Sequence, residues 1–333
     1  AQLLEAGADK DKANKDGDTP LLIAAQNGHE LVVAQLLEAG ADKDKATQTG
    51  VTPLFIAAQN GDAPVVARLL EAEADKDKAT QTGATPLFAA AQFDHASVVA
   101  QLLEAGADKN KAEQHGGATP LFAAALYGHE PVVAQLLEAG ADKDKVAYDG
   151  AAPLFVAAQN GHEPVVARLL EKGADKNKAQ QDGATPLFIA AQNGYEPVVT
   201  RLLEAEADMD KAGPDGATPL FIAAHEGHKN VVKRLLEAGA NNNKAAQGGV
   251  TPLIIAAARN NKEVVKLLLD HNANPLQKTN TQEKARNVTT DRDIYKMLQQ
   301  AEKQWTVKGF CDLEDVDDDS ESDSDVGESD SDV

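Results

Sequence analysis

The sequence predicts an all-α solenoid of stacked helix-turn-helix units, followed by an acidic tail. The main observation is a phrase, Thr-Pro-Leu followed by a bulky apolar residue and alanines, that returns along the 333-residue chain. Its copies begin at Thr19, Thr52, Thr85, Thr119, Ala152, Thr185, Thr218 and Thr251. They lie 33 residues apart, with a single step of 34, and a fixed period of this size indicates a stacked repeat array.

One unit shows why each segment is expected to be helical or extended. Thr52 can cap a helix with its hydroxyl, Pro53 suits the first helical position, and Gly61 supplies a left-handed stop. A second helix is expected over 64–71, where apolar residues at i, i+1, i+4 and i+5 form one stripe. The connector 74–78 alternates Asp and Lys without an apolar period, so we expect an exposed, extended arm.

The repeated residues resemble those of the ankyrin repeat. The shared features are Gly-x-Thr-Pro-Leu, paired alanines, Gly-His, Val-Val, Leu-Leu and Gly-Ala-Asp, and they cover roughly residues 1–305. The resemblance implies a turn, two antiparallel helices and a loop per unit, with turn tips and first helices lining a concave, protein-binding surface. An apolar residue such as Phe55 replaces the family histidine after Thr-Pro-Leu, so apolar packing must replace its hydrogen bonds. Lysines such as Lys43, Lys109 and Lys176 replace the usual aliphatic residue of the arm.

Several irregular positions are expected to strain or widen the array. Glu73 and Glu206 stand where a glycine such as Gly40 ends the second helix of other units. A non-glycine residue held in a left-handed conformation costs about 1 kcal/mol, so we predict two weak joints. Asp94 likewise replaces a glycine, and the one extra residue of the array lengthens the turn over 113–117.

Four segments follow from this pattern. Residues 1–18 form a partial repeat, 19–273 eight repeats, 274–308 a degenerate capping repeat and 309–333 an acidic tail that we expect to be disordered. Within the capping repeat, 291–305 has the pattern of an amphipathic helix. Because the chain opens in mid-repeat, we expect either a fragment of a longer array or a chain that begins where its boundaries were set.

Composition argues against several classes of protein. The formal net charge is −21, and residues 311–333 alone hold 12 acidic and no basic side chains, which disfavours nucleic-acid binding. No apolar run approaches the roughly 18–20 residues that span a bilayer, so we expect no membrane insertion. The single cysteine, Cys311, suits a reducing compartment, and we expect a monomer in the cytoplasm or nucleus.

The sequence contains no motif that indicates catalysis, a cofactor or a metal. His29, His129, His162 and His228 share one repeat position beside a glycine, which indicates a structural role rather than an asymmetric acid–base site. Neither a phosphate-binding glycine loop nor a zinc-ligand spacing occurs. We therefore expect a non-enzymatic scaffold that binds a protein partner.

The candidate partner site lies where the copies differ from one another. Most copies carry Gln-Asn before the glycine, whereas some carry aromatic or charged residues there. His115 and Tyr148 on neighbouring turn tips are added to these positions. The candidates are Phe93, His115, Leu126, Tyr127, Tyr148, His225, Glu226 and Arg259. The first five are predicted to form one compact patch, because aromatic clusters commonly anchor protein partners. The alternative is that Phe93 and Tyr127 fill gaps left by neighbouring alanines.

The tail suggests further contacts and leaves other functions open. Ser331, two positions before Val333, gives the end of the chain a resemblance to ligands of PDZ domains, which add such peptides to a sheet edge. Ser320, Ser322 and Ser329 each precede an aspartate by three residues and resemble acidophilic-kinase sites. The alternatives to a scaffold are a regulatory or targeting arm of a larger protein, including an enzyme, and an escort of basic proteins through the tail.

Overall fold

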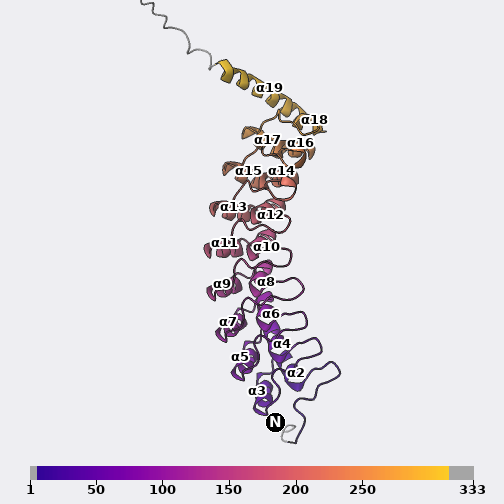
Figure 1. Ribbon diagram of the computed structural model, residues 1–333, viewed down its shortest axis with the longest axis vertical. Coiled ribbons are helices and arrows are strands. Elements are labelled where there is room, and N and C mark those ends of the chain that lie inside the picture. Colours follow the sequence, from indigo (N-terminus) through magenta and orange to yellow (C-terminus); the bar gives the residue numbers. More distant parts are fainter. Residues whose placement is uncertain (1–5, 315–333) are drawn as a thin grey trace, which may run out of the picture.

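The chain forms a long stack of short helices. The computed structural model describes residues 6–314, with side chains through residue 307, and contains no strand within that range. Figure 1 shows two parallel columns of helices, with a row of loops projecting along one side and one longer helix beyond the columns. The predicted all-α solenoid is confirmed.

Each complete unit places one helix in an inner column, beside the loops, and one in an outer column (Figure 1). The inner helices are α2 (Pro20–Gln26), α4 (Pro53–Asn60), α6 (Pro86–Gln92), α8 (Pro120–Tyr127), α10 (Pro153–Gln159), α12 (Pro186–Asn193), α14 (Pro219–Glu226) and α16 (Pro252–Ala258). The outer helices are α3 (Glu30–Glu38), α5 (Ala63–Glu71), α7 (Ala96–Glu104), α9 (Glu130–Glu138), α11 (Glu163–Glu171), α13 (Glu196–Glu204), α15 (Lys229–Glu237) and α17 (Lys262–Asp270). The array closes with α18 (Ala285–Val288) and α19 (Arg292–Glu314), and two 3-10 turns, η1 (Pro214–Gly216) and η2 (Gln247–Gly249), lie in the loops.

The inner helices begin as the sequence predicts. The hydroxyl of Thr52 accepts a hydrogen bond from the backbone N–H of Phe55 at 3.1 Å, and Pro53 occupies the first turn. The same buried cap starts every inner helix whose phrase begins with threonine. Only α10, among these helices, begins without a side-chain cap, at Ala152. A missing threonine cap lowers helix stability by about 1 kcal/mol, so this unit depends more on its neighbours.

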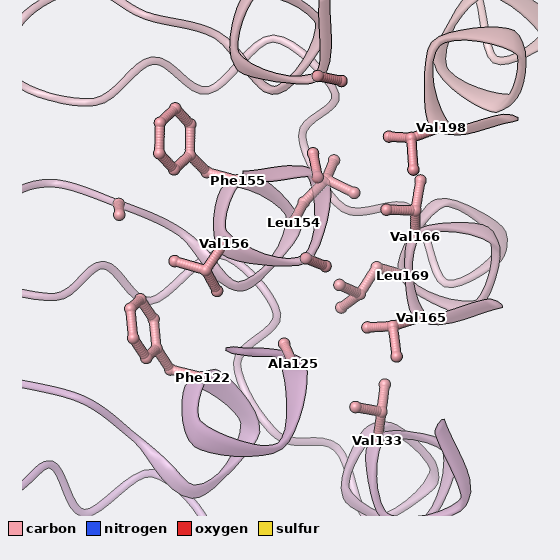
Figure 2. Packing of buried hydrophobic residues seen from close by; sticks show 14 of the residues in the cluster. Phe122, Ala125, Val133, Leu154, Phe155, Val156, Val165, Val166, Leu169 and Val198 are labelled. Carbon is pink, nitrogen blue, oxygen red and sulfur yellow. The ribbon is translucent and has the colours of Figure 1, made fainter. Parts of the chain in front are cut away.

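The hydrophobic core lies between the two columns and runs the length of the stack. In Figure 2, Leu154 of α10 points toward Val166 and Leu169 of α11, and all three are buried. Each such side chain contributes roughly 1.5–3 kcal/mol by leaving water. Phe122 and Phe155 point the other way, toward the loops, and are buried there (Figure 2). The predicted replacement of the family histidine by apolar packing is therefore confirmed.

The Asp-Lys arms differ from the exposed connectors that the sequence predicts. Lys78 donates from Nζ to the backbone oxygen of Asp44 in the preceding arm at 2.7 Å, and the N–H of Asp75 donates to Asp44 Oδ1 at 2.9 Å. Equivalent pairs of bonds recur in the next arm, where Lys111 donates to the backbone oxygen of Asp77. Adjacent arms are close enough for charge-assisted hydrogen bonds, so the lysines are partly buried and join the units. The expectation of solvated arms is therefore wrong for their lysines, whereas aspartates such as Asp75 remain exposed.

The two joints that lack glycine have the predicted backbone conformation. Glu73 and Glu206 are left-handed, with φ of 60° and 58°. At the first joint, Lys43 of the preceding arm donates to the carbonyl oxygen of Ala72 at the end of α5, and Lys176 makes the equivalent bond at the second. A cation at a helix C-terminus is favourable, so these bonds offset part of the strain. The other left-handed residues besides glycine are, within the described range, Asp94, Asp215, Asn260, Asn272 and Gln282.

The last unit differs from the rest of the array. Ile294 and Leu298 of α19 are buried in the common core, and Arg286 of α18 pairs with the buried carboxylate of Glu302 at 3.2 Å. The helix continues to Glu314, past the boundary predicted between residues 308 and 309. That boundary rested on composition, whereas a helix can pass through one glycine at a cost of about 1 kcal/mol. The predicted tail sites, Ser320, Ser322, Ser329, Ser331 and Val333, lie outside the described residues.

Candidate partner-binding surface

A groove of about 620 Å³ lies between the inner helices and the loops of the C-terminal half. Its wall is formed by α10, α12, α14 and α16, and its rim by the loops that precede α12, α14 and α16. Phe155, Phe188 and Phe221 are among the residues that line it, and each replaces the histidine of the ankyrin pattern. The groove therefore spans four consecutive units and follows directly from how they stack.

The chemistry of the groove combines apolar side chains with unpaired amides. Ile189, Ile222 and Ile255 are partly exposed along its wall. Gln159 and Gln192 also line the groove, and their side-chain amides form no hydrogen bond with another described residue. An amide can both donate and accept, so this wall offers hydrogen bonds beside apolar surface.

The charges that line the groove are acidic. The exposed carboxylates of Asp182 and Asp215 lie on the loops, and no Lys or Arg is among the described residues that line it. His225 of α14 lines the same groove. A ligand with apolar side chains and a positive charge near the rim would complement this surface, because opposite charges steer association and set register.

His225, Glu226 and Arg259 meet at the ends of two adjacent inner helices. Arg259 donates from Nε to Nε2 of His225 at 3.1 Å, and Nδ1 of His225 lies 2.8 Å from Oε1 of Glu226. With Nε2 accepting, the proton of a neutral His225 belongs on Nδ1, where it is donated to Glu226. Three of the predicted residues therefore form one hydrogen-bonded chain, beside the groove that His225 also lines.

Phe93 and Tyr127 follow the same local plan in neighbouring units. Their side chains are 47% and 50% exposed, so they do not fill gaps in the core. The ring of Phe93 stacks on His95 at 6.5 Å between centroids, and Tyr127 stacks on His129 at 6.0 Å. Each histidine also bonds the preceding unit, as His129 Nε2 does at 3.0 Å from the backbone oxygen of Gln92. The aromatic rings therefore cover the histidines that join one unit to the next.

Leu126 is tied to the same joints but faces the core. Its side chain packs against the buried cluster, and its backbone oxygen lies 3.0 Å from Nε2 of His162 in the next unit. His228 contacts the preceding unit in the same way. The predicted structural role of this histidine position is confirmed for His129, His162 and His228.

Tyr148 and His115 lie on the loops instead, at the widened turn. The ring of Tyr148 covers Gly117, where a Cβ would lie 2.6 Å from Cδ1 of the ring, and Tyr148 itself is 65% exposed. The carboxylate of Glu113 accepts from the N–H groups of His115, Gly116 and Ala118. Burial opposes the ionisation of Glu113, but these donors outweigh it and hold the pKa of Glu113 below its usual value.

The predicted compact patch is thus two separate features. His115 lies on the loop before α8 and Tyr148 on the loop before α10, which contacts Gly117 just before α8, whereas Tyr127 lies at the far end of α8. An eight-residue helix is about 12 Å long, which keeps the two groups apart. The sequence comparison between copies also does not single out Ile189, Ile222 or Gln192, because it treats recurring residues as framework. Their position relative to the phenylalanines is the signal that could find them. Ile189 and Ile222 directly follow Phe188 and Phe221, and Gln192 lies four residues after Phe188, one helical turn along α12.

Residues 6–307, whose side chains the structure describes, contain no group of three or more His, Cys, Asp or Glu side chains arranged to hold a metal ion. No helix in that range combines the length and apolar character needed to cross a membrane.

Comparisons with known proteins identify the repeats. The family described as ankyrin repeats (3 copies) matches residues 1–80, 64–147, 140–212 and 187–279. Among solved structures, the human ASB11 ankyrin repeat domain is similar, with 30% sequence identity and a TM-score of 0.59, over 66% of this chain and 98% of that one. No curated protein matches the sequence significantly. The family match covers most of the chain, which therefore belongs to the ankyrin-repeat proteins.

Proposed function

We propose that this chain is a non-enzymatic scaffold that binds a protein partner through the concave, loop-side groove of its C-terminal half. The observation that carries the proposal is the groove itself, which combines partly exposed isoleucines with unpaired amides and acidic rims. Ankyrin repeats are generally protein–protein interaction modules, which supports a protein as the ligand.

The groove favours an extended protein segment over a compact small molecule. It is lined by residues of four consecutive units, so a chain segment can contact each unit in turn. Unpaired Gln159 and Gln192 can bond the backbone of such a segment, while Ile189 and Ile222 cover its apolar side chains. Because the wall consists of packed helices, little order must be gained on binding, and pre-organisation of this kind favours affinity.

Affinity capture with matched variants tests this proposal. We expect Ile189→Asp combined with Ile222→Asp to weaken partner capture at least about tenfold, because two apolar contacts become buried charges. Gln159→Ala combined with Gln192→Ala should weaken it less and leave the fold intact, since neither amide has a partner in the described chain. The matched control is Leu31→Asp combined with Val32→Asp on the outer helix α3, where both side chains are exposed. Equal loss in the groove and control variants, with unchanged circular dichroism, would refute the groove.

The alternatives give different results in the same assay. If removal of residues 311–333 abolishes capture while the groove variants retain it, the chain acts through its tail, as an escort of basic proteins would. Such capture must weaken with salt, because attraction between exposed charges is screened. If only Phe93→Ala with Tyr127→Ala reduces capture, the partner contacts the helix ends rather than the groove.

The proposal also covers the location, the oligomeric state and a second partner of the chain. We place the scaffold in the cytoplasm or nucleus as a monomer, and we keep a PDZ domain as a candidate partner for the last residues. A regulatory arm of a larger protein, including an enzyme, would use the same groove to bind its target. Sedimentation of the full chain tests the monomer directly, and a titration with purified PDZ domains tests the second partner.

A further inference from the structure

Charge is distributed very unevenly along this chain. Residues 1–228 carry 34 acidic and 18 basic side chains, a net of −16. Residues 229–308 carry 7 acidic and 14 basic side chains, a net of +7, and residues 309–333 carry 12 acidic and no basic ones. The basic end of the array is thus placed between two acidic segments. Its net charge is therefore positive, whereas both flanking segments are negatively charged.

The basic side chains of this end gather on α17 and α19. On α19, Arg292, Lys296 and Lys303 are exposed and follow the spacing i, i+4, i+11, which places them along one face of the helix. On the neighbouring α17, Lys262 pairs with an aspartate, whereas the exposed Lys266 does not. Lys266, Arg292, Lys296 and Lys303 make no ion pair within 4 Å of another described residue. We call these four residues the basic face.

A groove of about 540 Å³ adjoins the basic face, between α17 and α19. Lys262 and Lys266 line one side together with the carboxylates of Glu263, which pairs with Lys229, and Asp270. Met297, Gln304 and the partly buried Trp305 line the other side. Apolar and amide groups therefore lie beside Lys266, which has no ion-pair partner among the described residues, and beside Lys262, which pairs with Asp293. An acidic segment could pair with the four cations of the basic face while the groove receives its occasional apolar residues.

We propose that the acidic segment 315–333 of the same chain docks on the basic face and along the α17–α19 groove. The segment holds ten acidic residues and no basic ones, with Val316 and Val326 as its apolar members before the last residue. It begins where α19 ends, at Glu314. Nineteen extended residues reach up to about 60 Å, whereas α19, at 23 residues, is about 35 Å long. The segment can therefore run back along the whole helix.

Docking has a consequence for binding. While the segment occupies the basic face, it excludes acidic partners from this end of the array and is itself withheld from basic proteins. Phosphate groups at Ser320, Ser322 or Ser329 would add negative charge and strengthen the contact, because each carries nearly two charges at neutral pH. The inference goes beyond the proposed scaffold function, since it concerns the α17–α19 end of the array and not the loop-side groove.

Trp305, the single tryptophan of the chain, is a natural reporter for this contact. A nitroxide label attached through Ser322→Cys, in a Cys311→Ser background, quenches tryptophan fluorescence only at close range. In the full chain we expect quenching at 10 mM salt and roughly two-fold recovery or more at 1 M, where the screening length falls from about 30 Å to about 3 Å. Chemical reduction of the nitroxide gives the unquenched reference.

Matched charge variants locate the contact. Lys266→Gln, Lys296→Gln and Lys303→Gln together should abolish the quenching at low salt. The control removes three exposed lysines far from α19, with Lys12→Gln, Lys15→Gln and Lys172→Gln, and should retain it. Quenching that is absent at low salt, or that survives the first set of substitutions, overturns the proposal. Quenching that rises with protein concentration also overturns it, because a second copy would then supply the segment.

Discussion

Residues 1–228 and residues 229–308 have the same backbone plan and opposite net charge. Both parts bury leucines, valines and alanines at equivalent repeat positions between two columns of helices. In their outer ion pairs, however, the acidic and basic residues exchange places between one unit and the next. Glu130 pairs with Arg168 of the following unit at 2.8 Å, whereas Lys229 pairs with Glu263 of the following unit at 2.9 Å. The surface positions of the repeat can therefore carry either a negative or a positive side chain.

The reason is that the two kinds of position contribute very different free energies. A buried leucine contributes roughly 1.5–3 kcal/mol, whereas an exposed ion pair contributes about 0–1 kcal/mol. Reversing a surface pair therefore hardly changes the stack, and the surface charges are available for recognition. Four substitution experiments test this comparison, from the largest expected effect to the smallest.

The common core is the strongest test of the comparison. We expect Leu121→Ala in the acidic part and Leu253→Ala in the basic part each to lower the free energy of unfolding by about 2–5 kcal/mol, because both side chains are buried and leave a cavity. Urea denaturation measures the loss, with Leu31→Ala as a control, since Leu31 is 77% exposed. A loss below about 1 kcal/mol in only one part would mean that the two parts have different cores.

The helix cap gives a smaller effect with an internal reference. Thr119→Ala should lower the free energy of unfolding by about 1 kcal/mol, because the N–H of Phe122 loses the hydroxyl that it bonds at 3.2 Å. Ala152→Thr should raise it by a similar amount, since α10 is the inner helix that lacks the cap. Thermal unfolding followed by circular dichroism measures both changes. If Ala152→Thr does not stabilise the chain, local crowding outweighs the new hydrogen bond.

The glutamate joints lie in the acidic part and should respond less. Glu206→Gly is expected to stabilise the chain by up to about 1 kcal/mol, because it relieves a left-handed side chain but adds freedom to the unfolded state. Lys176→Met should destabilise it, since the bond to the carbonyl oxygen of Ala205 is lost. Denaturation midpoints compare the two variants. Destabilisation by Glu206→Gly would show that the glutamate itself is useful at this joint.

The smallest effect concerns the ion pairs of the basic end at low pH. Hydrogen bonds and charge attraction from Lys229 and Lys262 lower the pKa of Glu263 and Asp293, respectively. A carboxylate whose pKa is lower in the folded state stabilises the fold above its unfolded pKa, and this contribution is lost as the pH falls through the folded pKa. We therefore expect slightly faster amide hydrogen exchange in α17 and α19 as the pH falls through the lowered pKa values of Glu263 and Asp293, after correction for the intrinsic exchange rate. Lys229→Gln combined with Lys262→Gln should remove this dependence; its persistence would assign it to other carboxylates.

The local features of the fold were predictable, whereas the contacts between units were not. The cap at Thr52 and the left-handed Glu73 depend only on nearby residues, so the sequence pattern identifies both. The bond from Lys78 to Asp44 joins residues 34 positions apart, and nothing in either arm alone indicates it. The candidate site shows the same division, because Tyr127 and Tyr148 lie close in sequence terms but at opposite ends of α8.

What the sequence by itself determined is the repeat: its 33-residue period, its helix starts and stops, its apolar stripes and the positions where copies differ. Only the tertiary structure decided which of those positions share a surface. It connected His225, Glu226 and Arg259, separated Tyr148 from Tyr127, and formed a groove from recurring residues such as Ile189 and Ile222. The physical reason is that helix signals act over a few residues, whereas a surface is set by the packing of whole units against each other.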